Sequence, residues 1–256
     1  MGAISKIEWT DATWNPVSGC TKVSPGCKNC YAERITERWG QEFTEVRERP
    51  ERLMQPLRWK NPRRVFTCSM ADLFHEQVSF EFIASVFHTM TGECDYKPPP
   101  AHTYQILTKR AVRMRQFFSW LERYSEGDEA YVLALQTLWF DDAPARNVWL
   151  GVSVEDQQRA EERIPDLLAT PAAVRFLSVE PLLGPVALRD LMDKIDWVIV
   201  GGESGPGARP MHPDWVRSIR DQCQAAGVPF FFKQWGGRSP KAGGRILDGR
   251  TWEEFP

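Results

Sequence analysis

Three cysteines with the spacing C-x6-C-x2-C, Cys20, Cys27 and Cys30, lie within eleven residues near the amino terminus. Three thiolates on one loop can bind three irons of a [4Fe–4S] cluster, which leaves the fourth iron open for a substrate or cofactor. A structural zinc ion usually takes four protein ligands, and the first histidine of the chain is His75. The spacing therefore favours an iron–sulfur site. Two alternatives remain open. One is a zinc ion whose fourth ligand is a distant histidine, and the other is three thiols that bind no metal.

Composition limits the classes of protein to which the chain can belong. It has 256 residues and six cysteines, and we find no signal peptide and no apolar stretch of membrane-spanning length. We therefore expect a cytoplasmic protein (in the host cell, if a phage encodes it) that has reduced thiols and does not contact a membrane. The net charge of −2 provides no general attraction to nucleic acid, and for the basic run at residues 58–64 a solvated loop is favoured over a phosphate contact, which stays open.

Short apolar runs alternate with amphipathic segments along the chain, which predicts parallel strands joined by helices. The predicted strands are 65–69, 104–108, 148–153, 174–179, 197–201 and 229–233, and a weaker one around 13–17 leads into the cysteines. The predicted helices are 31–39, 80–90, 111–124, 156–169 and 214–226, with Gly40 and Gly227 ending the first and the last. Cys68 is expected in a strand, Cys94 in a loop and Cys223 in the core, and none of them is assigned to a metal.

This alternation predicts an α/β fold, namely an incomplete (β/α) barrel of about six to seven parallel strands. We expect a single domain over residues 1–256, with insertions near 93–103 and 125–147 and a covering tail at 236–256. In such a barrel the active site lies at the carboxyl ends of the strands. Polar residues gather there: Ser69, Asp72, Lys109, Arg110, Ser153, Glu155, Glu180, Glu203, Ser204, Lys233 and Gln234.

A three-cysteine loop after the first strand of a partial barrel resembles the radical S-adenosylmethionine (SAM) superfamily. The usual motif there is C-x3-C-x2-C with a nearby aromatic residue; here Tyr31 follows Cys30, and the first gap is three residues longer. More closely, the chain resembles a phage-associated family of small three-cysteine proteins of mostly unassigned activity. The matching segments run along nearly the whole chain: Trp14-Asn15-Pro16, Gly26 to Ala32, Ser69 to Phe74, Leu107 to Arg110, Leu150 to Glu155, Leu177 to Pro181, Gly201 to Gly205 and Phe232 to Gly236.

The resemblance implies that the open iron binds the amino and carboxylate groups of SAM, and that a 5′-deoxyadenosyl radical takes a hydrogen atom from the substrate. The Gly-Gly-Glu-Pro-like turn that usually holds the methionine amino group is absent, and Ser69 to Asp72 occupies its place. Asp72 is predicted to accept a hydrogen bond from that amino group, and the alternative is an N-cap of the following helix. Lys109 or Arg110 is predicted to pair with the methionine carboxylate. The other predicted SAM contacts are Ser153 and Glu155 at the ribose, and Gly201, Gly202, Glu203 and Ser204 near the adenine. The alternative for these residues is that they form salt bridges and turns at the rim of the barrel.

Six residues are predicted to serve the substrate: Asn15, Gln234 and Trp235 as contacts, and Glu180, Lys233 and Cys68 as candidates for a catalytic role. The alternatives are core packing for Trp235 and a loop cap for Glu180. Radical SAM isomerases of phages remodel amino-acid groups attached to 5-hydroxymethyluracil in DNA. The most specific hypothesis is therefore an isomerase that shifts a glycyl-type attachment from nitrogen to carbon. A lesion-repair or methyl-transferring radical enzyme, and a zinc-stabilised DNA-binding or adaptor protein without turnover, are the alternatives. The expected partners are modified DNA and a reductant such as flavodoxin or ferredoxin, and the oligomeric state is open.

Overall fold

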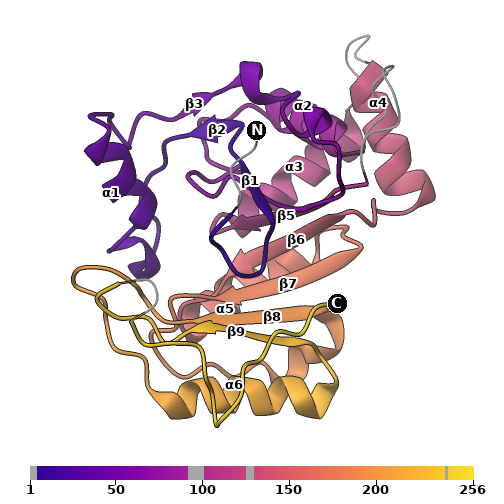
Figure 1. Ribbon diagram of the computed structural model, residues 1–256. Coiled ribbons are helices and arrows are strands. Elements are labelled where there is room, and N and C mark those ends of the chain that lie inside the picture. Colours follow the sequence, from indigo (N-terminus) through magenta and orange to yellow (C-terminus); the bar gives the residue numbers. More distant parts are fainter. Residues whose placement is uncertain (1–4, 92–100, 125–129, 240–241) are drawn as a thin grey trace. The chain divides into compact units, whose positions relative to one another are not determined.

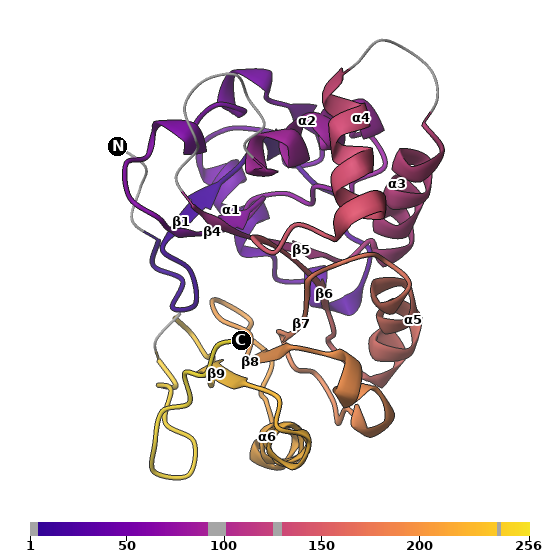
Figure 2. The same cartoon turned by 90° about the vertical axis from the view of Figure 1, so that its right-hand side faces the viewer.

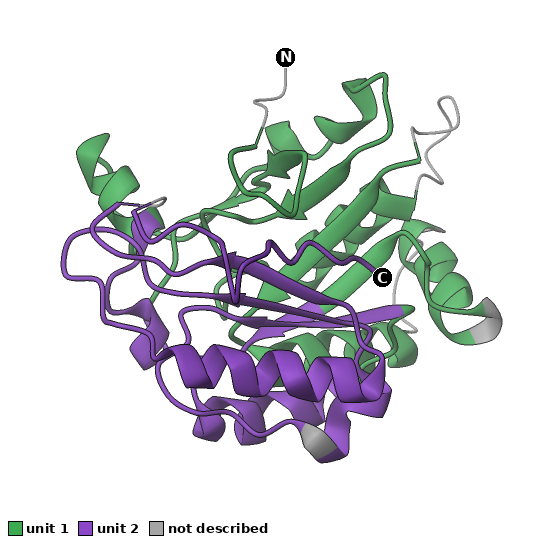
Figure 3. Ribbon diagram, turned by 60° about the horizontal axis from the view of Figure 1, so that its bottom comes forward, with its two compact units in different colours: residues 1–21, 32–150, 169–173 green, residues 22–31, 151–168, 174–256 purple. Residues whose placement is uncertain are grey.

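A computed structural model describes residues 5–91, 101–124, 130–239 and 242–256 (Figure 1). Most of the insertion predicted near 93–103, including Cys94, lies outside these residues. The contacts within the chain define two compact units (Figure 3). Unit 1 comprises residues 1–21, 32–150 and 169–173, and unit 2 comprises residues 22–31, 151–168 and 174–256.

The strands form an α/β topology with one large sheet. A seven-stranded sheet has the order β1-β4-β5-β6-β7-β8-β9, and the pairs β1–β4, β4–β5, β7–β8 and β8–β9 are parallel. The strands of this sheet follow one another in sequence order, and β1 and β9 lie at its two ends. This arrangement agrees with the prediction of an incomplete barrel of six to seven parallel strands. The bounds are β1 Ala12–Trp14, β4 Arg64–Thr67, β5 Thr103–Thr108, β6 Val148–Ser153, β7 Val174–Val179, β8 Trp197–Gly201 and β9 Phe230–Gln234, and a separate antiparallel pair joins β2 Val17–Ser18 to β3 Arg47–Glu48.

Helices α2, α3 and α4 lie beside one another in unit 1 (Figures 1 and 2). Their shared core is aromatic: Phe87 contacts Phe117 and Phe118 at ring-centroid distances of 5.2 and 5.6 Å, and Trp139 at 5.4 Å. Burial of such rings is a large favourable term in folding. The helices are α1 Tyr31–Arg38, α2 Phe80–Thr91, α3 Ala111–Arg123 and α4 Ala130–Gln136, and α4 continues as a π-helical segment, Thr137–Asp142.

Part of the segment predicted as an insertion at 125–147 is therefore helical. Val132, Leu135 and Trp139 are buried, and their spacing of three and four residues is that of one helix face. The sequence contained this signal. Shorter turns of 3-10 helix are also present: Pro25–Cys27, Pro50–Arg52, Pro56–Arg58 and Arg189–Lys194.

In unit 2, helix α5 spans Gln157–Leu168, and helix α6 spans Pro213–Ala226 and runs alongside β8 and β9 (Figures 1 and 2). Gly227 ends α6 as predicted, because its φ of 69° places it in the left-handed region that glycine adopts without a steric penalty. Cys223 is fully buried on this helix, which confirms its expected place in the core. The tail packs back on the sheet, since Phe231 bridges Glu253 and the Phe232 amide donates to the Trp252 carbonyl at 3.0 Å.

The expectation that Cys68 lies within a strand is wrong. Strand β4 ends at Thr67, and Cys68 has a φ of 62°, which turns the chain away from the extended conformation. Its amide still donates to the Trp14 carbonyl at 2.7 Å. A positive φ is costly for a residue other than glycine, so the surrounding structure must impose this turn. Among the residues described here, no helix has the length and apolar character needed to cross a membrane.

Candidate functional site

The cysteine loop, residues 20–30, has three half-buried thiols that are not in disulfides, Cys20, Cys27 and Cys30. Cys20 belongs to unit 1, and Cys27 and Cys30 belong to unit 2. Within the described ranges, no group of three or more His, Cys, Asp and Glu residues that could hold a metal ion is found. The ligand set therefore stays a prediction, although each unit fixes its own part of the loop through defined contacts.

Gly19 and the backbone of Cys20 fix the start of the loop in unit 1. Gly19 has a φ of 82°, and a Cβ atom at this position would lie 2.2 Å from the Glu45 carbonyl oxygen. Only glycine fits such a close backbone approach. The Cys20 amide then donates to the Phe43 carbonyl at 2.8 Å, and Gly19 bridges Ala71 after β4. The backbone therefore places Cys20 beside the carboxyl end of β4.

The buried guanidinium group of Arg110 contacts the Cys20 sulfur. Its Nη1 donates to Cys20 Sγ at 3.6 Å and to Asp72 Oδ2 at 3.2 Å. Its Nη2 donates to the carbonyl and the Oγ1 of Thr21 at 3.1 and 2.9 Å, and its Nε donates to both oxygens of Glu76 at 2.9 to 3.0 Å. Burial alone would lower the pKa of Arg110, but the charges of Asp72, Cys20 and Glu76 raise it, so this group stays charged. Its donors are all used within unit 1, which leaves none for the predicted methionine carboxylate.

Asp72 accepts hydrogen bonds at both of its oxygens. Oδ1 accepts from Thr108 Oγ1 at 2.7 Å and from the Phe74 amide at 3.0 Å, and Oδ2 accepts from the Lys109 amide at 3.0 Å as well as from Arg110. The alternative that it caps the following helix is wrong, because α2 begins only at Phe80. The carboxylate instead ties the end of β4 to the end of β5.

Two further contacts in unit 1 involve predicted residues. Asn15 Oδ1 accepts from Ser69 Oγ at 3.2 Å and from the Met70 amide at 2.9 Å, which joins the segment after β1 to the segment after β4. His75, the first candidate for a distant zinc ligand, contacts Thr21 Oγ1 through Nε2 at 2.9 Å. Burial and the charge of Arg110 lower the pKa of His75, so its ring is neutral at pH 7.

In unit 2, the buried carboxylate of Glu155 holds the loop through Ser24. Ser24 Oγ donates to Glu155 Oε1 at 2.7 Å and also lies 3.8 Å from Cys27 Sγ. Arg163 Nη1 donates to Glu155 Oε2 at 3.0 Å and to the Ser153 carbonyl at 2.8 Å. A Cβ atom at Gly26 would lie 2.4 Å from Glu155 Oε1, so glycine lets the loop pack directly on this carboxylate.

Glu203, after β8, holds the other side of the loop in unit 2. It accepts from Arg209 Nη2 at 2.6 Å, from Arg209 Nε at 2.9 Å and from Asn29 Nδ2 at 2.8 Å. Arg209 Nη2 also donates to the Pro25 carbonyl at 3.0 Å. Burial alone would raise the pKa of Glu203, but the hydrogen bonds from Arg209 and Asn29 lower it to about 2. The segment that contains Cys27 and Cys30 is thus fastened to an ionised carboxylate.

A half-buried ion pair joins the ends of β7 and β9 in unit 2. Lys233 Nζ donates to Glu180 Oε1 at 2.6 Å, and the two side chains are 17% and 20% exposed. Strand β8 lies between them in the sheet order, and a Cβ atom at Gly201 would be 3.1 Å from Glu180 Cδ. The absence of a side chain at Gly201 therefore lets the carboxylate reach across β8.

The segments after β8 and β9 contact each other closely. Gln234 Nε2 donates to Ser204 Oγ at 2.9 Å. A Cβ atom at Gly202 would lie 2.1 Å from the Trp235 carbonyl oxygen, so this glycine is needed for the close approach of two backbones and not as an open surface. The Trp235 indole donates to the Ile246 carbonyl at 2.8 Å and packs edge-on against Phe232.

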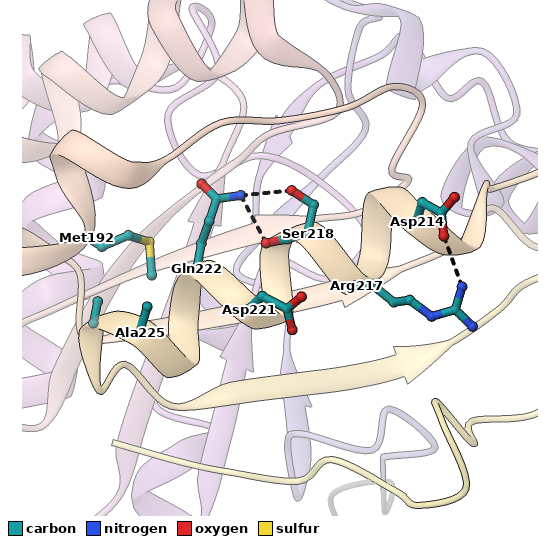
Figure 4. A pocket seen from close by; sticks show the side chains of 8 residues that line it. Met192, Asp214, Arg217, Ser218, Asp221, Gln222 and Ala225 are labelled. Atoms are coloured by element: carbon teal, nitrogen blue, oxygen red, sulfur yellow. Dashed lines mark hydrogen bonds and ion pairs between the residues drawn. The ribbon is translucent and has the colours of Figure 1, made fainter.

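A groove runs along α6 in unit 2 (Figure 4). Two of its charged side chains pair with each other, since Arg217 Nη1 donates to Asp214 Oδ1 at 2.9 Å, and the third, Asp221, pairs with Arg220. None of the predicted site residues lines it, and we assign it no function. The lining residues are Met192, Asp214, Arg217, Ser218, Asp221, Gln222, Ala225 and Ala226.

The structure thus brings together several of the predicted residues and adds partners that sequence reasoning missed. Asp72 accepts from the Lys109 amide and from Arg110, which also contacts Cys20. Glu180 meets Lys233, and Ser204 meets Gln234. The missed partners have no motif of their own, although the two arginines lie eight and six residues after their glutamates in the sequence. They are Ser24 and Arg163 at Glu155, and Asn29 and Arg209 at Glu203.

Fold and site together define an α/β protein with a three-cysteine loop near the ends of parallel strands. The chain belongs to the DUF5131 family, described as protein of unknown function, whose model matches residues 4–256. No curated protein and no solved structure was found to match it.

Proposed function

We propose that this protein is a radical SAM enzyme in which Cys20, Cys27 and Cys30 hold a [4Fe–4S] cluster. The observation that carries the proposal is the way the loop is anchored. Residues 24–29 are fastened to Glu155 and Glu203, which follow β6 and β8, and the Cys20 sulfur accepts a hydrogen bond from Arg110. Anchoring of this kind suits cysteines that must be held for a ligand at the carboxyl edge of the strands.

The donor chemistry fits such a cluster. Cysteines outside disulfides are the natural ligands of a [4Fe–4S] cube, and N–H donors near the sulfurs are among the features that tune it. When bound, a reduced cluster supplies the electron that cleaves SAM into methionine and a 5′-deoxyadenosyl radical. The protein's own residues must position SAM and substrate and keep water away.

The contacts divide the predicted SAM residues into two groups. Asp72, Glu155 and Glu203 have both carboxylate oxygens engaged by the chain itself. We propose that these three act through the loop and not by touching SAM. The space beside Gly201 and Gly202 is taken by Glu180 and by the Trp235 backbone, so the residues kept as proposed SAM contacts are Ser69, Lys109, Ser153 and Ser204.

The Glu180–Lys233 pair supports an amino-acid-bearing substrate. A carboxylate beside an ammonium group complements a zwitterion: Lys233 would bind the carboxylate of a glycyl group, and Glu180 would bind its amine. The two charges of such a ligand would compensate Lys233 and Glu180 when their mutual contact is given up. We therefore propose an isomerase of an amino-acid-modified thymidine in phage DNA, with Asn15, Gln234 and Trp235 as further substrate contacts and a flavodoxin or ferredoxin as reductant.

The test is anaerobic incubation of reduced protein with SAM, with and without DNA that contains aminoacyl-thymidine. We expect 5′-deoxyadenosine and a rearranged nucleoside by chromatography. Cys27→Ala should abolish both products, whereas Cys223→Ala, at a buried cysteine outside the loop, should retain them. If 5′-deoxyadenosine is released but the DNA is unchanged, this substrate is ruled out, whereas the proposed enzyme class is not.

A lesion-repair or methyl-transferring radical enzyme is the second candidate, and Cys68 is the observation that favours it. Its thiol is buried, and burial raises its pKa, so the sulfur keeps its hydrogen at pH 7. A protonated thiol near β4 could donate a hydrogen atom to a product radical. Cys68→Ala should stop such a lyase and leave an isomerase active, which distinguishes the two by product analysis.

A further inference from the structure

Arg110 makes a set of contacts that a surface arginine does not need. The side chain is 4% exposed, and its five N–H donors are directed at one sulfur, two carboxylates and Thr21. Asp72 is nearly as buried, whereas Glu76 is 60% exposed. A buried cation therefore contacts the Cys20 sulfur, and the Asp72 carboxylate accepts from the same nitrogen, Nη1, of that cation.

Burial of a guanidinium group is costly unless its charge and its donors are compensated. Asp72 and Glu76 provide that compensation, and Thr21 is the residue after Cys20, so the same group also fixes the backbone at the start of the loop. Burial of a charged group costs more free energy than burial of an apolar side chain, so packing alone does not explain this arrangement. It has a clear physical use if Cys20 is a thiolate ligand, because a nearby cation and an N–H···S bond stabilise the more negative, reduced state of the bound group.

We propose that Arg110 is a positioning residue for Cys20 that raises the reduction potential of the cluster, and that Asp72 opposes this effect by partly neutralising Arg110. The proposal rests on the radical SAM function proposed above. It replaces the sequence-based expectation that Arg110 pairs with the methionine carboxylate.

The variants Arg110→Gln and Asp72→Asn give opposite predictions. Loss of the cation should lower the equilibrium constant for one-electron reduction by about tenfold, which corresponds to about 59 mV toward more negative potential. Loss of the Asp72 charge should move the potential in the other direction. A purely structural role for both residues would predict a loss of cluster in both variants, without shifts of opposite sign.

Arg113 provides a matched control. It lies one turn further along α3, donates to the His75 and Val78 carbonyls at 3.2 and 2.8 Å, and places its guanidinium over the Phe80 ring. Arg113, like Arg110 through Glu76, contacts the segment 75–80, and none of these three contacts of Arg113 involves a cysteine. Arg113→Gln should leave the potential unchanged.

The experiment is a redox titration of reconstituted protein without SAM, followed by electron paramagnetic resonance. Two results would overturn the inference, provided that the wild-type protein binds iron. One is a reduction potential of Arg110→Gln equal to that of the wild type, and the other is shifts of the same sign in Arg110→Gln and Asp72→Asn. If Arg110→Gln does not fold or does not bind the cluster, the inference is tested with Asp72→Asn and with Arg110→Lys, which keeps the charge. An unshifted reduction potential in Asp72→Asn would then count against the inference. Wild-type protein that takes up no iron would instead refute the proposed function.

Discussion

Glu203→Gln tests whether an ionised carboxylate holds the segment with Cys27 and Cys30. Lowering the pKa of Glu203 from 4.5 to about 2 corresponds to about 3 kcal/mol, at about 1.4 kcal/mol per pKa unit. Glu203 is 7% exposed, but the Arg209 side chain is 27% exposed, so solvent screens part of this energy. We expect the substitution to reduce the free energy of unfolding by about 2 to 3 kcal/mol at pH 7.

The pH dependence of this loss follows from the direction of the pKa change. A carboxyl group with a lowered pKa in the folded state contributes its full stability above its ordinary pKa of 4.5, and loses it as pH falls through about 2. The difference between wild type and Glu203→Gln should therefore be constant from pH 7 to 5 and shrink below pH 4.5. Urea unfolding followed by tryptophan fluorescence measures it, and hydrogen exchange should show weaker protection in residues 22–31.

Asp248→Asn is the matched control. The Asp248 carboxylate accepts hydrogen bonds from Arg217 and Arg220, which lower its pKa to about 2 as well, but Asp248 and Arg217 are 38% and 43% exposed to solvent. Its loss should change stability much less, because solvent and salt screen exposed ion pairs. A Glu203→Gln effect that does not vary with pH, or that is no larger than the Asp248→Asn effect, would refute the reasoning.

Two further substitutions test the loop and the ion pair. Gly26→Ala places a Cβ atom 2.4 Å from Glu155 Oε1 and should cost about 1 to 3 kcal/mol in thermal unfolding, whereas Gly184→Ala, with no atom within 4 Å, should be nearly neutral; equal melting temperatures would contradict this. Lys233→Met removes the partner of Glu180 and should abolish conversion of the DNA while 5′-deoxyadenosine is still released, as product analysis will reveal; unchanged conversion would exclude Lys233 from substrate binding.

The strands could be predicted from the sequence because each buried parallel strand is a short continuous apolar run. The predicted and observed bounds agree at 148–153, 174–179 and 197–201. The turn at Cys68 could not be predicted, since its positive φ is imposed by neighbours from elsewhere in the chain.

The site was predicted less completely, and for a physical reason. Residue type and position at a strand end identified Glu155 and Glu203, but not whether their oxygens were free. Arg163 and Arg209 use these oxygens, and their side chains can be assigned to a partner only when the fold is known. Gly202 illustrates the same limit. The sequence suggests that a residue without a side chain leaves room for a ligand, but the Trp235 backbone occupies that space.

The central claim is that Cys20, Cys27 and Cys30 bind an iron–sulfur cluster. An anaerobic count of iron, sulfide and zinc on purified and reconstituted protein tests it most directly. The account predicts about four irons and about four sulfides per chain, lost in Cys27→Ala and retained in Cys223→Ala. Bound zinc, or no metal after reconstitution, would contradict the account and favour a zinc-stabilised binding protein or an unmetallated one.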